Sequence, residues 1–253
     1  MAKNSGRRKA KGIVLSGFNT VRECFNSPHI KVQELYLRDG LHVKTLDWSI
    51  PQKTNITWLK RGDCMLEDLH QGIGCRISAP NWGDYRDYIE KLTNKKKKPI
   101  LLMLDQVEDP NNLGQILRTC DGAGVDAVLV PDRRSVSLTR AAIQTSQGAF
   151  AWVPFFHVGN LRQAIDFIKT KGFWLYACEY TKSSRWWFEE TYTGPVVLVF
   201  GSEGRGMRQL TLQSCDQTIK LPMFGKINSL NVGASVSAVL YEIARQRIKG
   251  QGN

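Results

Sequence analysis

The sequence predicts an α/β protein whose larger, C-terminal part holds a mainly parallel sheet and whose N-terminal part is a smaller α/β unit. From Pro99 onward, apolar runs alternate with amphipathic helical patterns, which is typical of parallel strands joined by helical crossovers. Before that point, residues 79–99 are polar and carry Pro, Gly and four consecutive lysines, which marks a boundary. A chain of 253 residues, 42% of them hydrophobic, has room for two such units.

The first unit is expected to span residues 13–80, after a basic tail over 1–12. Its predicted elements are a helix around 21–25, strands at 32–39 and 56–60, and a loop followed by a strand within 69–78. Residues 81–98 are predicted to be a linker that contains one short helix.

The second unit is expected to span residues 99–253. Strands are predicted at 100–107, 125–131, 173–179, 195–201 and 217–222. Helices are predicted at 113–124, 138–149, 161–172, 207–215 and 231–248. Because ligands bind at the carboxyl ends of parallel strands, the loops that follow these strands are the places to look for a site.

Charge points to a polyanionic partner. The formal net charge is +12, and basic residues gather at the N-terminus, at 95–98 and near the C-terminus, so a nucleic acid is favoured as the partner. No run has the 18 or so apolar residues of a membrane span. The six cysteines form no CxxC pair and the four histidines are scattered, so no zinc site is expected and the thiols suit a reducing cytoplasm.

A glycine pattern at residues 122–127, GAGVDA, imitates a dinucleotide-binding fingerprint. That fingerprint needs a strand before the glycines and a helix after them, so that a pyrophosphate meets a helix N-terminus. Here a helix precedes the glycines and a strand follows. Gly122 and Gly124 are therefore interpreted as a helix end and a turn, and a nucleotide-dependent oxidoreductase is disfavoured.

Three loops after predicted strands carry polar residues and glycines. The first runs from Asp109 to Asn112 and is followed by Arg118, the second is GSEGRGM from Gly201, and the third contains Ser229 to Asn231. Taken singly, the first and third are also explained as ordinary capped helices with an exposed arginine.

Together, these three loops resemble, in order and spacing, the three motifs of the SpoU-type RNA 2′-O-ribose methyltransferases of the trefoil-knot superfamily. The resemblance covers about residues 99–248 and includes TSQGAF at 145–150. In the first unit, GFNTVRECF at 17–25 and HQGI at 70–73 resemble the L30e-like substrate-binding domain of the bacterial enzymes that methylate a guanosine ribose of 23S ribosomal RNA.

The resemblance implies a deep trefoil knot, S-adenosylmethionine as cofactor, a homodimer whose sites are completed across the interface, and no metal. The apolar face of helix 231–248 is expected to contribute to that interface. The residues implied to hold the cofactor are Gly201, Leu221, Met223 and Leu230. The residues implied to be catalytic are Asn112, Arg118, Glu203, Ser229 and Asn231.

The implied chemistry is demanding because a ribose 2′-OH is a poor nucleophile, which must be positioned and must lose its proton. A free arginine is a poor base at neutral pH, so Arg118 is either that base or a clamp on the phosphate and the emerging alkoxide. An ionised Glu203 only accepts hydrogen bonds, which favours a role in holding loop N–H groups. The predicted function is methylation of structured RNA, most directly a 23S ribosomal RNA guanosine. The alternatives are a tRNA 2′-O-methyltransferase and a non-catalytic RNA-binding assembly factor.

Overall fold

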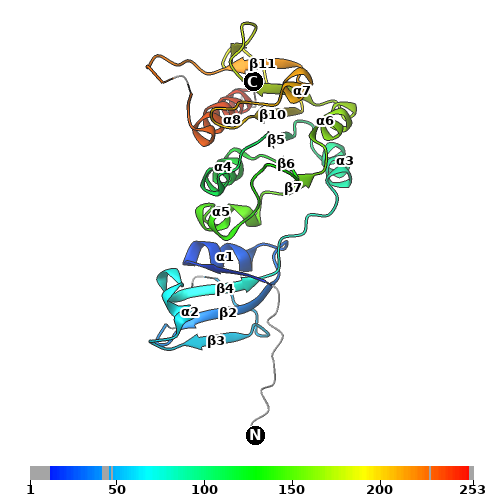
Figure 1. Cartoon of the computed structure of the whole chain (residues 1–253). Coiled ribbons are helices and arrows are strands. Elements are labelled where there is room, and N and C mark those ends of the chain that lie inside the picture. Colours follow the sequence, from blue (N-terminus) through cyan, green and yellow to red (C-terminus); the bar gives the residue numbers. More distant parts are fainter. Residues whose placement is uncertain (1–11, 42–45, 47, 228, 251–253) are drawn as a thin grey trace. The chain divides into compact units, whose positions relative to one another are not determined.

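Two units make up the computed structural model, which describes residues 12–41, 46, 48–227 and 229–250 (Figure 1). The first unit is Met1–Asn81 and the second is Trp82–Asn253. In the described part, no helix is both long and apolar enough to cross a membrane.

A four-stranded sheet forms the first unit. Its elements are β1 (Ile13–Ser16), α1 (Phe18–Asn26), β2 (Val32–Arg38), β3 (Ile56–Leu59), α2 (Cys64–Glu67), a 3-10 turn η2 (His70–Gly72) and β4 (Ile73–Ile77). The sheet order is β1-β4-β2-β3, with β4 antiparallel to both of its neighbours and β2 parallel to β3. Helix α1 turns Val21 and Cys24 inward because they lie three residues apart on one face. The predicted elements of this unit are present, and β1 and α2 were not predicted.

Residues 81–98, expected to be a linker with one short helix, contain that helix, and the second unit begins at Trp82. Residues Tyr85–Lys95 form helix α3, which Asp84 caps by accepting from the N–H groups of Arg86 and Asp87. Ile89 on this helix is fully buried in the core of the second unit. Tyr85, Tyr88 and Leu92 pack against the same core, so the apolar and aromatic side chains of α3 recur at helical spacing on one face.

Strands and helices alternate through the rest of the second unit. The strands are β5 (Ile100–Leu104), β6 (Ala127–Pro131), β7 (Phe155–Val158), β8 (Trp174–Cys178), β9 (Arg185–Trp186), β10 (Val196–Phe200) and β11 (Gln217–Lys220). The helices are α4 (Pro110–Ala123), α5 (Arg140–Thr145), α6 (Leu161–Thr170), α7 (Gln209–Gln213) and α8 (Val232–Lys249), with a 3-10 turn η3 (Ala149–Ala151). The strands β7 and β9 were not predicted, and β9 has only two residues.

The sheet of the second unit has the order β7-β6-β5-β10-β8-β11-β9, and every neighbouring pair is parallel. The prediction of a mainly parallel sheet is thus confirmed. Helices cover both faces, with α4, α5 and α8 on one face and α3, α6 and α7 on the other (Figure 1).

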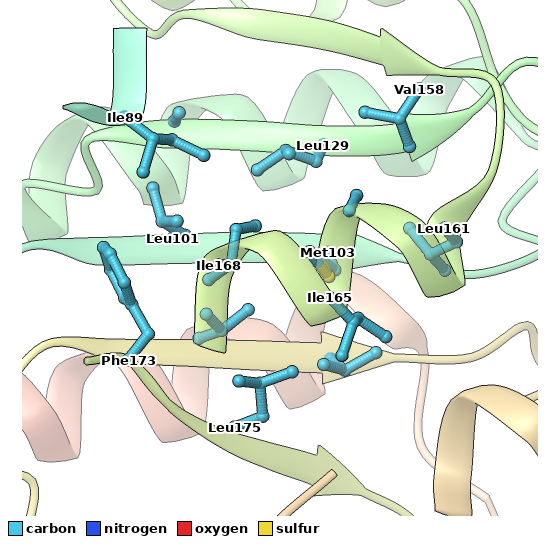
Figure 2. Packing of buried hydrophobic residues seen from close by; sticks show 14 of the residues in the cluster. Ile89, Leu101, Met103, Leu129, Val158, Leu161, Ile165, Ile168, Phe173 and Leu175 are labelled. Atoms are coloured by element: carbon cyan, nitrogen blue, oxygen red, sulfur yellow. The ribbon is translucent and has the colours of Figure 1, made fainter. Parts of the chain in front are cut away.

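The core explains why these strands are central. Every residue of β5 and of β10 is buried, as expected of parallel strands covered on both faces. Helix α6 places Leu161, Ile165 and Ile168 at helical spacing toward Leu101 and Met103 of β5 (Figure 2).

The glycines at 122–127 form a turn, as predicted. Gly124 follows the last residue of α4 with φ +71°, the left-handed conformation that glycine adopts without strain, and β6 begins at Ala127. The helix-before-strand order excludes a dinucleotide fingerprint at this position.

Candidate active site

Two acidic residues and a glycine directly follow three neighbouring strands in the middle of the second sheet. Asp105 comes after β5, Gly201 after β10 and Glu179 after β8. Because these strands are adjacent and parallel, all three residues lie at one edge of the sheet, where ligands bind in folds of this kind.

The glycine loop after β10 closes upon itself. Ser202 and Gly206 exchange backbone hydrogen bonds of 3.1 and 3.0 Å. A Cβ on Gly201 would lie 2.3 Å from the carbonyl carbon of Gly206 and 2.5 Å from the backbone nitrogen of Met207. From the sequence we expected Gly201 to let the backbone approach a ligand. The structure shows a different requirement for glycine here, because a side chain would collide with the backbone of the same loop.

Two acidic residues that sequence reasoning missed hold this loop. The Glu179 carboxylate accepts from the backbone N–H of Met207 at 3.2 Å. Asp105, fully buried, accepts from the backbone N–H of Arg208 at 3.0 Å and pairs with its guanidinium at 2.9 Å. The signal that could have found them is an acidic residue standing first after an apolar strand.

Glu203 joins the three predicted motifs. Its Oε1 accepts from Asn112 Nδ2 at 3.2 Å, from Asn231 Nδ2 at 2.8 Å and from the backbone N–H of Val232 at 3.0 Å. Asn231 Nδ2 also donates to Asn112 Oδ1 at 2.9 Å. We call Asn112, Glu203 and Asn231 the motif cluster. The structure therefore brings together one predicted residue from each of the three loops.

Helix caps set the positions of two members of this cluster. Asp109 caps α4, which places Asn112 in the first turn of that helix. Asn231 caps α8, and its Oδ1 accepts from the N–H groups of Gly233 and Ala234 at 2.9 and 3.3 Å. Each polar atom of the Asn231 side chain therefore has a partner, so this residue both starts a helix and binds Glu203.

Two adjoining cavities contain the residues predicted to hold a cofactor. A cavity of about 380 Å³ is lined by Gly201, Ser229 and Leu230 together with Cys178, Glu179 and Ser235. A smaller one of about 160 Å³ shares Ser229 and Leu230 and adds Leu221 and Met223. The size and the mixed polar and apolar lining suit a small organic ligand.

A further cavity lies on the other side of Glu203. It has about 350 Å³ and is lined by Asn112 and Arg205, by the turn at 106–109, and by Ser202, Glu203 and Val232. Ser202, Glu203 and Val232 also line the 380 Å³ cavity. Ser202, Glu203 and Val232 thus form a common wall between two cavities.

Arg118 stands apart from this arrangement. It lies on the exposed side of α4 and, within the described residues, its side chain makes no hydrogen bond or ion pair. It lines none of the three cavities. The structure does not bring Arg118 to the motif cluster of its own chain.

The chemistry of the lining limits what the site can do. Burial raises the pKa of the Cys178 thiol to about 12, so this cysteine is neutral at physiological pH and is a poor nucleophile. Among the described residues, no group of three or more His, Cys, Asp or Glu side chains could hold a metal ion.

Comparison with known proteins assigns the family. Residues 99–241 match the model of the SpoU rRNA methylase family. The chain belongs to this family. A protein of Staphylococcus haemolyticus named as a TrmH family tRNA/rRNA methyltransferase is 34% identical over 241 residues, which cover 93% of this chain and 96% of that protein. The chain is accordingly an RNA methyltransferase of the SpoU/TrmH family.

Solved structures share the fold across nearly the whole chain. The SpoU methyltransferase AviRb from Streptomyces viridochromogenes, in complex with AdoMet, has a TM-score of 0.79 at 19% identity and covers 98% of this chain and 94% of its own. The TrmH/SpoU tRNA modifying enzyme of A. aeolicus has a TM-score of 0.56 at 30% identity and covers 65% of this chain and 85% of its own.

Proposed function

We propose that this protein transfers a methyl group from S-adenosylmethionine to a ribose 2′-OH of structured RNA, the target being a guanosine of 23S ribosomal RNA. The observation that carries the proposal is the wall formed by Glu203 and the glycine loop, which has a cavity on each side. One cavity suits the methyl donor and the other suits the acceptor nucleotide. We place this activity in the cytoplasm, where the six unpaired cysteines stay reduced.

The residues of the 380 Å³ cavity fit S-adenosylmethionine. Its lining includes the loop residues Gly201 and Leu230, whose backbone N–H and C=O groups can recognise an adenine edge. Leu221 and Met223 extend the apolar lining, and the Glu179 carboxylate suits a cationic or hydroxyl-bearing ligand. When bound, the cofactor supplies a sulfonium methyl group that is open to in-line displacement.

The chain's own residues position the acceptor. The motif cluster fixes the wall between the cavities, so that the 2′-oxygen can bond to the methyl carbon as the carbon–sulfur bond breaks. Arg205 and the turn at 106–109 line the acceptor cavity, where a guanidinium suits an RNA phosphate. Ser229 lines the donor cavity, and its hydroxyl can hydrogen-bond to the donor.

Arg118 is proposed to act from the second copy in a homodimer. Its exposed side chain, which has no partner within the described part of its own chain, suits a site completed across an interface. There it would contact the phosphate and the emerging alkoxide of the RNA, or accept the 2′-OH proton.

The expected interface needs one revision. The apolar face of α8 is buried inside its own unit through Val236, Val239 and Ile243. The exposed residues Tyr241 and Ile248 remain on the outer side of α8, so we propose that this side and the outer side of α4 face the partner.

The first unit is proposed to be the RNA-selecting module, with an L30e-like fold, and the C-terminal chain is proposed to form the trefoil knot of the family. Two arrangements support these proposals: the mixed four-stranded sheet with α1, and the meeting of the loops at 201–207 and 229–232 beside Glu203. The tRNA modifying enzyme mentioned above covers 65% of this chain, which is close to the share of the second unit. A ribosomal target therefore accounts for the additional module.

Nucleoside mass spectrometry tests the proposal directly. The full chain and residues 82–253 are each incubated with S-adenosylmethionine and either 23S ribosomal RNA fragments or total tRNA. We expect 2′-O-methylguanosine in the ribosomal RNA with the full chain and a large loss without residues 1–81. If tRNA is methylated and ribosomal RNA is not, the substrate is tRNA rather than ribosomal RNA. A product methylated on the base would contradict the proposed methylation of the ribose.

A further inference from the structure

An exposed aromatic surface borders the donor cavity and has no role in the function proposed above. It consists of Tyr180, Trp186 and Phe188 with the ammonium of Lys220, and we call it the aromatic platform. Tyr180 is 77% exposed and Phe188 49% exposed. The rings of Trp186 and Phe188 are parallel, with centroids 6.3 Å apart. Large aromatic side chains gathered in solvent mark a contact surface more often than a structural one.

Sheet topology places the platform beside the reacting groups. Tyr180 lies just after β8, Lys220 ends β11 and Trp186 ends β9, and these are neighbouring parallel strands. Their carboxyl ends lie at the edge of the sheet that carries the glycine loop. Tyr180 and Lys220 also line the 160 Å³ cavity together with Leu221.

Lys220 makes the platform cationic. Its Nζ lies 4.5 Å from the ring centroid of Trp186 and 5.3 Å from that of Tyr180. A lysine over an aromatic ring is also common where a protein binds no ligand, so the lysine alone does not indicate a binding surface. Here it lies between two rings from different elements, at the mouth of a cavity.

The charges around the rings are mixed but favour an anion. Lys182 and Arg185 are exposed on the segment that connects Tyr180 to Trp186. On the acidic side, Glu190 lies 3.6 Å from the Arg185 guanidinium, and Glu189 accepts from the Trp186 backbone N–H at 3.3 Å. The acidic groups are thus engaged locally, while Lys182 and Lys220 carry no ion pair in the described residues.

We propose that the aromatic platform binds unpaired nucleotides of the RNA that flank the methylated ribose, by stacking bases on Tyr180 and Phe188 while Lys220 and Lys182 contact phosphates. This proposal rests on the proposed function, since the platform would bind the RNA strand whose ribose enters the acceptor cavity. Stacking on aromatic rings tolerates any base, and an unpaired strand offers base faces that a duplex hides. The platform therefore selects single-stranded segments rather than a sequence.

Fluorescence anisotropy with the full-length protein tests this binding. The probes are a short labelled oligoadenylate RNA and a blunt RNA duplex of equal length, at one fixed salt concentration because salt alone changes such affinities. The variant is Tyr180→Ala/Phe188→Ala, and Tyr180→Phe/Phe188→Tyr keeps both rings. Trp174→Ala is the matched control, because Trp174 is 52% exposed at the opposite end of β8.

We expect the alanine variant to bind the single strand at least about fivefold more weakly, since each stacked base is worth about 1–3 kcal/mol by alanine substitution and 1.4 kcal/mol is tenfold. The ring-keeping variant, the Trp174 control and all duplex affinities should stay within about twofold of the wild type. Unchanged single-strand binding by the alanine variant, or an equal loss with the duplex, would overturn the proposal.

Two further measurements distinguish base stacking from a role in the donor site and from a contact between copies of the chain. Calorimetry with S-adenosylhomocysteine should give wild-type affinity for the single variant Phe188→Ala, because Phe188 lines neither donor cavity. A loss of affinity there would make the platform part of the donor site instead. Light scattering should give an unchanged mass, and dissociation would make the platform an interface between copies. Absence of any RNA methylation by the wild type would refute the proposed function but would leave the single-strand result as it stands.

Discussion

The motif cluster and Arg118 are both expected to be catalytic, but they differ in their contacts: the cluster residues bind one another, and the Arg118 side chain is exposed. Asn112, Glu203 and Asn231 come from three distant loops and bind one another at 2.8–3.2 Å. Arg118 lies only six residues after Asn112 on the same helix, but it is exposed and has no side-chain partner in the described part of the chain. The motif cluster is assembled within a single chain, whereas we propose that Arg118 joins the site only with RNA or a second copy.

This difference separates two kinds of functional residue. Members of the cluster stabilise the fold and the site together, because their hydrogen bonds hold the loops that line both cavities. The Arg118 side chain makes no hydrogen bond or ion pair in the described residues, so we expect its substitution to affect chemistry far more than stability. The following substitutions test that separation.

The largest effect on cofactor binding is expected from a substitution in the glycine loop, where backbone atoms approach one another closely. Gly201→Val should abolish binding of S-adenosylmethionine, because the new side chain would lie within 2.5 Å of backbone atoms of Gly206 and Met207 and would force the loop open. Isothermal calorimetry measures the affinity. Gly225→Val is the control, since a Cβ there meets nothing within 4 Å. Wild-type affinity of Gly201→Val would remove the glycine loop from the cofactor site.

Arg118→Ala should lower single-turnover methyl transfer by at least about a hundredfold, which is about 2.7 kcal/mol of the activation barrier. Cofactor affinity and the melting temperature should stay at wild-type values, because the side chain has no partner within the described chain. Arg118→Lys tests whether charge alone is enough, since lysine cannot form a bidentate contact with phosphate. Activity within about threefold of the wild type would leave Arg118 without a catalytic role.

Glu203→Ala should lower both stability and activity, in contrast to Arg118→Ala. Three donors lose their common acceptor, and because the cluster is exposed to water we expect a loss of about 1–2 kcal/mol of unfolding free energy. Denaturant titration of the isolated protein measures this. Glu203→Gln keeps one acceptor oxygen and should recover most of the stability. If Glu203→Ala is as stable as the wild type, the motif cluster does not hold the loops.

Asn231→Ala should give the smallest effect, a loss of about 1 kcal/mol from the cap of α8. Asn160→Ala, which removes the cap of α6 far along the chain, is matched to it because the Asn160 side chain likewise accepts from a first-turn N–H. Both variants should lose similar stability in thermal unfolding, and Asn231→Ala alone should also slow methyl transfer. Equal methyl-transfer rates for the two variants would reduce Asn231 to a structural cap.

The alternation of apolar runs and helical patterns was enough to predict the parallel sheet, because buried parallel strands such as β5 and β10 are apolar at every position. The short strand β9 was not predicted, because it has two residues and its pairing with β11 is set by tertiary contacts. Helix α3 was expected as a short helix within a linker, because the surrounding Pro, Gly and lysines were given more weight than the apolar spacing of its buried face.

For the candidate site, the sequence named candidate residues but could not show how they lie relative to one another. Motif resemblance selected Asn112, Glu203 and Asn231, and the structure places them in hydrogen-bonding contact. Glu179 and Asp105 carry no motif, and only the strand order shows that they lie under the glycine loop. The exposure of Arg118 depends on its face of α4, which the motif spacing does not reveal.

Mixed dimers test most directly the central claim that the two regions form one site across two copies. Arg118→Ala and Glu203→Ala chains, each inactive as a pure dimer, are unfolded, mixed in equal amounts and refolded together. If each site takes Glu203 from one chain and Arg118 from the other, half of the randomly paired dimers hold one intact site, and methyl transfer returns to roughly a quarter of the refolded wild type. No recovery above the two pure variants, in a mixture that light scattering shows to be dimeric, would contradict the account.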